Sequence, residues 1–171
     1  VELKEYITLI SAQAYTDAMT GIRNKSAYLD RVKVLEQRIA ERMADFTVYV
    51  FDVNGLKRMN DTFGHEYGDM LIKDAAGVLK AVFREDSIYR TGGDEFVIIL
   101  PQVGAEQAKA LVTRLKDEES HFSLRDRNIS ISYGISCIEH MDAPFQQYLD
   151  AADQEMYLDK KKHKQQERAL P

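Results

Sequence analysis

Two adjacent glycines, Gly92-Gly93, stand between two short runs of residues that favour β-structure. The runs are residues 87–89 (SIY) and 96–100 (FVIIL). Because glycine readily adopts the positive φ angles that tight turns require, this pattern predicts a β-hairpin. The turn also carries two neighbouring acids, Asp94-Glu95, which suit hard cations and phosphates. Taken alone, the acids are equally consistent with an ordinary surface turn.

Helix-like and strand-like segments alternate along the rest of the chain. Strand patterns cover residues 47–53 (TVYVFDV) and 129–137, where apolar and small residues alternate. Helical patterns cover residues 1–16, 26–42, 66–82, 105–118 and 143–162, with Ser26 as the expected cap of the second. With the hairpin, this order predicts an α+β fold in which helices pack on a sheet with antiparallel pairs.

The first helical segment carries a short heptad stripe. The stripe consists of Leu3, Ile7, Ile10 and Ala14. It is about two heptads long, which fits the end of a coiled coil and equally a short helix packed on its own domain. Because the chain opens on Val1, we expect a piece of a longer protein. We divide it into an N-terminal helix (1–16), one folded domain (17–164) and a polar tail that frays (165–171).

The composition indicates one soluble globular domain. The chain has 171 residues and a net charge of −5, which argues against broad nucleic-acid binding. The single Cys137 excludes an internal disulfide and a cysteine-based zinc site. No apolar run approaches the length of a membrane span and no signal peptide is evident. We therefore expect a cytoplasmic domain without direct membrane contact.

Asp52 ends the strand pattern at residues 47–53. If this strand lies beside the hairpin, Asp52, Asp94 and Glu95 meet at one edge of the sheet. Carboxylates this close cannot all ionise at low cost without a cation. Mg²⁺ fits, because it prefers one or two carboxylates with phosphate oxygens, and two such ions can clamp a displacement at phosphorus. The alternative is a strand-end acid that bonds a turn.

Groups that suit a nucleotide follow Asp52. A turn with glycine precedes Lys57, and its backbone N–H groups could hold an anion beside the lysine charge. Asn60 and Asp69 offer an amide and a carboxylate that can read the Watson–Crick edge of guanine. Each could also simply cap a helix.

Two further sets of residues are ambiguous on their own. Lys160 and Lys164 share a face at the end of the last helix, where lysines also interact favourably with the helix dipole. His65 could be a ligand or a base, but the other histidines show no zinc spacing relative to it. These residues gain meaning only in combination with the others.

Taken together, these segments resemble the GGDEF family of diguanylate cyclases. The matching segments are TDAMTGIRN, FDVNGLKRMNDTFGHEYGD, RTGGDEF, ISISYGIS and DQEMYLDKKKHK, in order from about residue 17 to 164. The resemblance implies a mainly antiparallel five-stranded sheet wrapped by helices, akin to the ferredoxin-like palm of nucleotidyl cyclases. It also implies condensation of two GTP molecules into cyclic di-GMP by a homodimer, with release of two pyrophosphates.

The resemblance assigns roles to individual positions. The resemblance implies two Mg²⁺ ions per GTP, and Mn²⁺ can take their place. The positions that match metal ligands are Asp52, Val53 (through its carbonyl), Asp94 and Glu95. The catalytic positions are Asp94, Lys57 and Glu95, the last as a candidate base for the ribose 3′-OH. Asn60 and Asp69 match guanine readers, and Lys57, Lys160 and Lys164 match phosphate contacts. The remaining positions that match substrate contacts are Leu56, His65, Ile72, Gly92 and Gly93.

The chain departs from the family at its inhibitory site. The common site is an Arg-x-x-Asp, and its Asp position is Asp86 here. The Arg position holds Phe83, with Arg84 one place late, which turns a helical side chain by about 100°. We therefore predict that this inhibitory site is absent and that the product does not inhibit tightly through it.

Two departures concern the active site itself. A frequent second acid after Asp52 is replaced by Asn54, which is not a matched metal ligand, so we expect activity to survive. At the end of the last helix, His163 and Lys164 replace the usual Gly and Arg. Lysine keeps the charge but loses the bidentate fork, which predicts weaker triphosphate affinity.

The leading hypothesis is thus an active, Mg²⁺-dependent diguanylate cyclase controlled by an N-terminal sensor. The alternative is a catalytically inactive domain that binds GTP and regulates a neighbouring module. The intact Asp94, Lys57, Asn60 and Asp69 favour the enzyme. A receptor for cyclic di-GMP is disfavoured by Phe83.

Overall fold

The computed structural model describes residues 2–123, 128–139 and 141–169. Residue 1 of the expected N-terminal helix and residues 170–171 of the expected tail lie outside the described residues. In chain order the elements are α1 (Glu2–Tyr15), α2 (Lys25–Ala40), β1 (Thr47–Val53), α3 (Leu56–Phe63), α4 (His65–Val82), η1 (Glu85–Ser87), β2 (Ile88–Arg90), β3 (Glu95–Leu100), α5 (Ala105–Ser123), β4 (Ile131–Cys137) and α6 (Phe145–Ala169).

The strands form one antiparallel sheet in the order β2-β3-β1-β4. β2 and β3 are the predicted glycine hairpin, and β1 lies between β3 and β4, with Val50 opposite Val97 and Gly134. The expectation of five strands was wrong, since the sheet has four within the described residues. The segment beside β2 reaches the sheet only through a single bridge between Arg23 and Tyr89, too short for a fifth strand.

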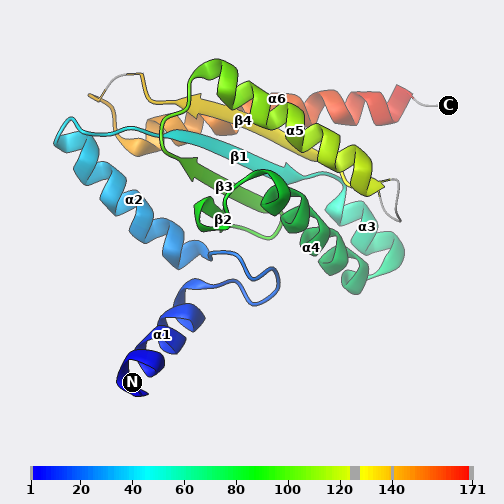
Figure 1. Ribbon diagram of the computed structural model, residues 1–171. Helices are drawn as coiled ribbons and strands as arrows, with labels where there is room; N and C mark the ends of the chain where they lie inside the picture. Colours follow the sequence, from blue (N-terminus) through cyan, green and yellow to red (C-terminus); the bar gives the residue numbers. More distant parts are fainter. Residues whose placement is uncertain (1, 124–127, 140, 170–171) are drawn as a thin grey trace.

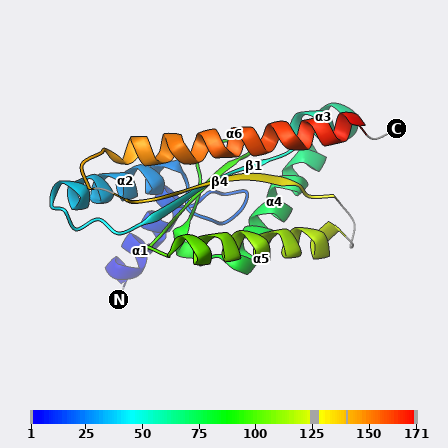
Figure 2. The same cartoon turned by 90° about the horizontal axis from the view of Figure 1, so that it is seen from above.

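Helices cover both faces of the sheet (Figures 1 and 2). Alternate residues of β1 point to opposite faces. Tyr49 and Phe51 belong to the core shared with α4 and α5, whereas Val48 and Val50 belong to the core shared with α2 and α6. Because both faces of β1 are packed, the end of this strand, which carries Asp52, is firmly positioned.

Helix α6 lies directly on β4 at Gly134. A Cβ at this position would lie 1.8 Å from the Ala152 carbonyl oxygen and 2.6 Å from the Met156 nitrogen. Only a glycine permits so close an approach between helix and strand. The contact fixes the height of α6 above the sheet.

Some expected helix ends were wrong. Helix α2 is capped by Asn24, whose side chain accepts a hydrogen bond from the Ala27 N–H at 3.1 Å, rather than by Ser26. Helix α6 continues to Ala169 instead of ending at Lys162, because Gln, Glu, Arg and Ala in the expected tail are good helix formers. Two ends shift less: α5 ends at Ser123 and β4 begins at Ile131.

Helix α1 projects from the rest of the domain (Figure 1), and none of its residues is buried. The side chains of Leu3, Ile7 and Ile10 are exposed, so the heptad stripe is not packed on its own domain. The side chain of Asn24 holds the end of the helix by donating to the Ala14 carbonyl at 2.9 Å. No helix in the described chain is long and apolar enough to cross a lipid bilayer.

Candidate active site

The adjoining ends of β1 and β3 bring the acidic residues together. Asp52 lies directly opposite Glu95, and the Val53 N–H donates to the Asp94 carbonyl at 2.9 Å. The expectation that these two strands are neighbours is therefore confirmed. All three acids stand at one edge of the sheet.

Asp52 is buried, and its carboxylate meets a lysine from α6. Lys160 Nζ donates to Asp52 Oδ1 at 2.6 Å. Burial raises the pKa of Asp52 above its ordinary value, the bond to Lys160 opposes this rise, and the charges of Asp94 and Glu95 add to it. The edge therefore holds negative charge that favours a nearby cation, and Lys160 supplies one.

The acidic turn between β2 and β3 is held by hydrogen bonds from its own first residues. Arg90 donates to the Gly93 carbonyl at 2.9 Å and to both carboxylate oxygens of Asp17 at 3.1 and 3.2 Å. Thr91 Oγ1 donates to Glu95 Oε1 at 2.8 Å. The turn is thereby connected to the segment that follows α1.

Asn54 fastens the end of β1 to the segment around β4. Its Nδ2 donates to Ser130 Oγ at 2.9 Å, and its Oδ1 accepts from Ser132 Oγ at 3.0 Å. Gly55 follows with φ +74°, a left-handed conformation from which α3 begins at once. The asparagine at this position thus has a structural use.

Residues 56–63 form helix α3, although they were expected to lie in a turn and its approach to the next helix. The error arose because the helix has eight residues, shorter than the window in which helical periodicity is recognised. The first N–H groups of a helix have no partner within it. The free N–H groups of α3 therefore lie close to the backbone of Lys57, the second residue of the helix.

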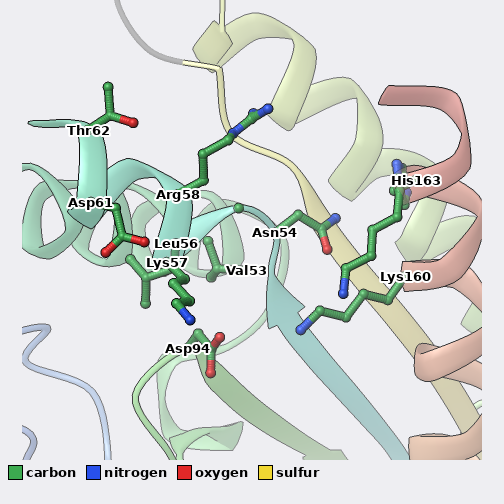
Figure 3. A pocket seen from close by; sticks show the side chains of 12 residues that line it. Val53, Asn54, Leu56, Lys57, Arg58, Asp61, Thr62, Asp94, Lys160 and His163 are labelled. Atoms are coloured by element: carbon green, nitrogen blue, oxygen red, sulfur yellow. The ribbon is translucent and has the colours of Figure 1, made fainter. Parts of the chain in front are cut away.

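A cleft of about 460 Å³ opens between α3, the acidic turn and α6 (Figure 3). Figure 3 shows Lys57 and Asp94 next to each other, while Lys160 extends from α6 toward the end of β1. The cleft is lined by Val53, Asn54, Gly55, Leu56, Lys57, Arg58, Asp61, Thr62, Asp94, Lys160, His163 and Lys164. Cationic side chains from two helices therefore surround an acidic sheet edge.

The cleft gathers part of the predicted set. The predicted residues that line it are Val53, Leu56, Lys57, Asp94, Lys160 and Lys164. Asn60 is half-buried on α3, His65 and Asp69 are exposed on α4, and Gly92-Gly93 is an exposed turn. Ile72 is only 2% exposed and belongs to the core, so the structure does not bring its side chain to the cleft.

The acids at the sheet edge do not form a closed metal cage. Within the described residues, no three or more His, Cys, Asp and Glu side chains are grouped so that together they could hold a metal ion. Glu95 instead accepts the Thr91 hydroxyl, and Asp52 accepts Lys160. The metal-ligand assignment of Asp52, Asp94 and Glu95 therefore stays a prediction.

Six residues line the cleft without having been predicted as site residues. They are Asn54, Gly55, Arg58, Asp61, Thr62 and His163. Arg58, Asp61 and Thr62 follow from α3: a helix that begins after Gly55 places Lys57 and Asp61 four residues apart on one face. His163 stands at a position where the family usually has glycine, and its Nε2 lies 3.6 Å from Asp159 Oδ2.

The position of the expected inhibitory arginine is part of the core. Phe83 is buried, and its ring centroid lies 5.3 Å from that of Tyr49 and 5.8 Å from that of Phe51. Arg84 is exposed and pairs with Asp86 at 3.0 Å. Position 83 is thus occupied by an apolar side chain that packs in the core.

Comparisons with known proteins show the family to which this chain belongs. The family model for the diguanylate cyclase GGDEF domain matches residues 14–166. Diguanylate cyclase DgcP of Pseudomonas aeruginosa is 36% identical over 157 residues, which are 87% of this chain and 23% of DgcP. Diguanylate cyclase DgcS of Shewanella oneidensis is 31% identical over 151 residues, 86% of this chain and 50% of DgcS.

The fold is similar to that of diguanylate cyclase SiaD from Pseudomonas aeruginosa in the crystal structure of its complex with the activator SiaC. The TM-score is 0.79 at 23% sequence identity, covering 94% of this chain and 64% of that one. The chain therefore belongs to the GGDEF family of diguanylate cyclase domains, which confirms the resemblance and the predicted fold class. It spans 23% of the length of DgcP and 50% of the length of DgcS.

Proposed function

We propose that this domain is an active diguanylate cyclase, which condenses two GTP molecules into cyclic di-GMP and releases two pyrophosphates. The supporting observation is one cleft in which Asp94, at the β1–β3 edge beside Asp52, faces Lys57 and Lys160 from two helices. Phosphoryl transfer depends mainly on positioning and on stabilising charge at the transferred group. Acids and lysines on opposite sides of a cleft suit both tasks.

The acidic edge fits Mg²⁺. The buried Asp52 already holds a cation, the Lys160 ammonium, at 2.6 Å. We assign Asp52, Asp94 and the Val53 carbonyl as ligands of two Mg²⁺ ions, with Mn²⁺ as a substitute. When bound, such ions neutralise phosphate charge and polarise the reacting oxygens. Glu95 lies opposite Asp52 and is the candidate acceptor for the proton of the ribose 3′-OH.

The triphosphate lies, in this proposal, between α3 and α6. The N-terminus of α3 offers backbone N–H groups and a partial positive charge to an anion. Lys57 adds a full charge on one side of the cleft, and Lys160 and Lys164 add charge on the other. These lysines would stabilise the leaving pyrophosphate.

Guanine recognition is assigned to Asn60 and Asp69, on α3 and α4. The carboxylate of Asp69 is exposed and able to accept from the N1–H and N2–H₂ groups of guanine. Asn60 Oδ1 is buried and has no hydrogen-bond partner within the described chain. Because this oxygen lies against Gly68 of α4, we assign the other end of the amide, the Nδ2 group, to the O6 or N3 side of the base.

Catalysis requires two copies, because each protomer would present one GTP. The exposed stripe of α1 supports a dimer that forms through this helix, in the manner of a short coiled coil. The relatives are longer than this chain, which supports control by a sensor domain connected through α1.

The test is the reaction itself in a protein forced to dimerise. We would fuse a dimeric coiled coil in register with α1, incubate the fusion with GTP and Mg²⁺, and measure cyclic di-GMP and pyrophosphate. Asp94→Ala should abolish product, whereas Asp153→Asn, on the exposed face of α6, should not. Absence of product from the fused dimer would overturn the proposal.

A second candidate is a domain that binds GTP without turnover and regulates a neighbouring module. It is favoured by one observation, that the acids of the described chain do not form a preformed metal cage. GTP binding by the fused dimer without product would support this candidate.

A further inference from the structure

Helices α3 and α4 form a tight pair joined by Gly64, and they lie side by side in Figure 1. Asn60 lies on α3 and Gly68 in the first turns of α4, where the two helices face each other. Gly68 is buried, and the side chains of Asn60 and Leu56 on α3 leave no room for a side chain at this position.

The absent side chain of Gly68 is replaced by the amide of Asn60. A Cβ at position 68 would lie 1.8 Å from Asn60 Oδ1, 2.8 Å from Asn60 Cγ and 3.1 Å from Leu56 Cδ1. The first two distances are far below van der Waals contact. The amide of Asn60 therefore rests on the bare Cα of Gly68, which explains why its Oδ1 is buried although no hydrogen bond holds it.

We propose that Gly68 is a positioning residue for guanine recognition: it provides the space that holds the Asn60 amide in the orientation used to read the base. The inference rests on the proposed function, because it concerns the same nucleotide site. The position of the Asn60 amide follows from the packing of α3 on α4, so it can be tested without any nucleotide. A single methyl group at position 68 must displace the end of the Asn60 side chain, whereas the helical backbone can stay in place.

The same helix contains a matched control. Gly77 also lies within α4, but it is exposed and a Cβ there would meet no atom within 4 Å. Replacing a glycine inside an exposed helix by alanine ordinarily stabilises the helix, so Gly77→Ala should raise the melting temperature by about 2–4 °C. Gly68→Ala should gain the same helix propensity, but its methyl group has to displace the Asn60 side chain.

The first measurement needs no nucleotide. We would compare Gly68→Ala and Gly77→Ala with the wild-type domain in ¹⁵N spectra, and determine the crystal structure of Gly68→Ala. We expect a cooperatively folded Gly68→Ala protein in which the Asn60 side-chain amide resonance and rotamer change, and an unchanged Asn60 in Gly77→Ala. An Asn60 amide that keeps its place in Gly68→Ala overturns the inference, whether or not the domain binds GTP.

The second measurement is nucleotide affinity by calorimetry, with GTP and ATP as probes. Gly68→Ala should lose about tenfold in GTP affinity, the scale of one lost base contact, while its weaker ATP affinity should not change. In an Asn60→Ala background, Gly68→Ala should have no further effect on GTP. An equal loss in that background, or unchanged GTP affinity in the single variant, contradicts the inference. A wild-type domain that fails to bind GTP contradicts instead the proposed function.

Discussion

Lys160 and Asp52 are joined by an ion pair whose nitrogen and oxygen lie 2.6 Å apart, although the residues are 108 positions apart in sequence. In the proposed reaction the acid binds Mg²⁺ and the lysine binds phosphate. We therefore expect nucleotide and metal to weaken this pair when they enter. Until then, the ammonium and a divalent cation compete for the same carboxylate.

Lys160→Met should have two effects of opposite sign. Without nucleotide, Mn²⁺ should bind more tightly, because its competitor for Asp52 is gone. With nucleotide, GTP affinity should fall about tenfold, in keeping with the loss of a charged hydrogen bond. Mn²⁺ titrations followed by electron paramagnetic resonance, and GTP calorimetry, measure both. Lys162→Met, an exposed change on the same helix, is the control, and changes of equal sign would contradict the argument.

Asp52→Asn should stabilise the metal-free domain at neutral pH. Burial raises the pKa of Asp52, so the stability linked to its protonated form is complete below about pH 4 and is lost as the pH rises through the raised value. The melting temperature of wild type should therefore fall relative to that of the variant between about pH 4 and pH 7. Calorimetry without divalent cations tests this, and a pH-independent difference would refute it.

Arg90→Gln should have the opposite effect and destabilise the domain at neutral pH. Burial raises the pKa of Asp17, but the hydrogen bonds from Thr20 and the Arg90 guanidinium outweigh it and leave the pKa lowered. Stability from this pair is present above the ordinary pKa and is lost as the pH falls through the lowered value. We expect a loss of about 1–3 kcal/mol in unfolding free energy at pH 7, which shrinks below about pH 4.

Urea unfolding at pH 7 and at pH 3.5 measures the Arg90→Gln effect. Arg84→Gln is the matched control, because its pair with Asp86 is exposed and should contribute less than about 1 kcal/mol. A loss of similar size in both variants would mean that the link from Asp17 to the acidic turn has no special role.

Cyclic di-GMP should not inhibit the enzyme tightly through the usual inhibitory site. Phe83 is buried in the core, and Arg84 forms an ion pair with Asp86. Initial rates of the fused dimer, measured at rising product concentrations, should stay constant through the low micromolar range. A rate halved in that range would contradict this prediction.

The sequence predicted those parts of the site that depend on local patterns. The glycine hairpin and the strand that ends in Asp52 follow from turn chemistry and from the strong β-preference of their residues, and the structure has both. Helix α3 was missed because it is short and directly follows a glycine. With it, the contributions of Arg58 and Asp61 to the cleft were missed as well.

Contacts between distant segments could not be predicted from such patterns. The pairing of Lys160 with Asp52, and the use of Asn54 to bond Ser130 and Ser132, depend on how α6 and β4 lie against β1. Ile72 matched a substrate-binding position, but the side of α4 that carries it faces the sheet. Periodicity could have indicated this, since Ile72 lies three residues before Ala75 and seven before Leu79, which are buried on the same face of α4.

The close contact at Gly134 fixes the position of α6 relative to β4, and so the position of the residues farther along the helix. The helix touches β4 there through Ala152 and Met156, and Lys160 lies about one turn beyond Met156. A side chain at position 134 would tilt the helix and carry the lysine away from Asp52 without changing any residue of the cleft. The ion pair between Lys160 and Asp52 thus depends on the absence of a side chain at position 134 of β4.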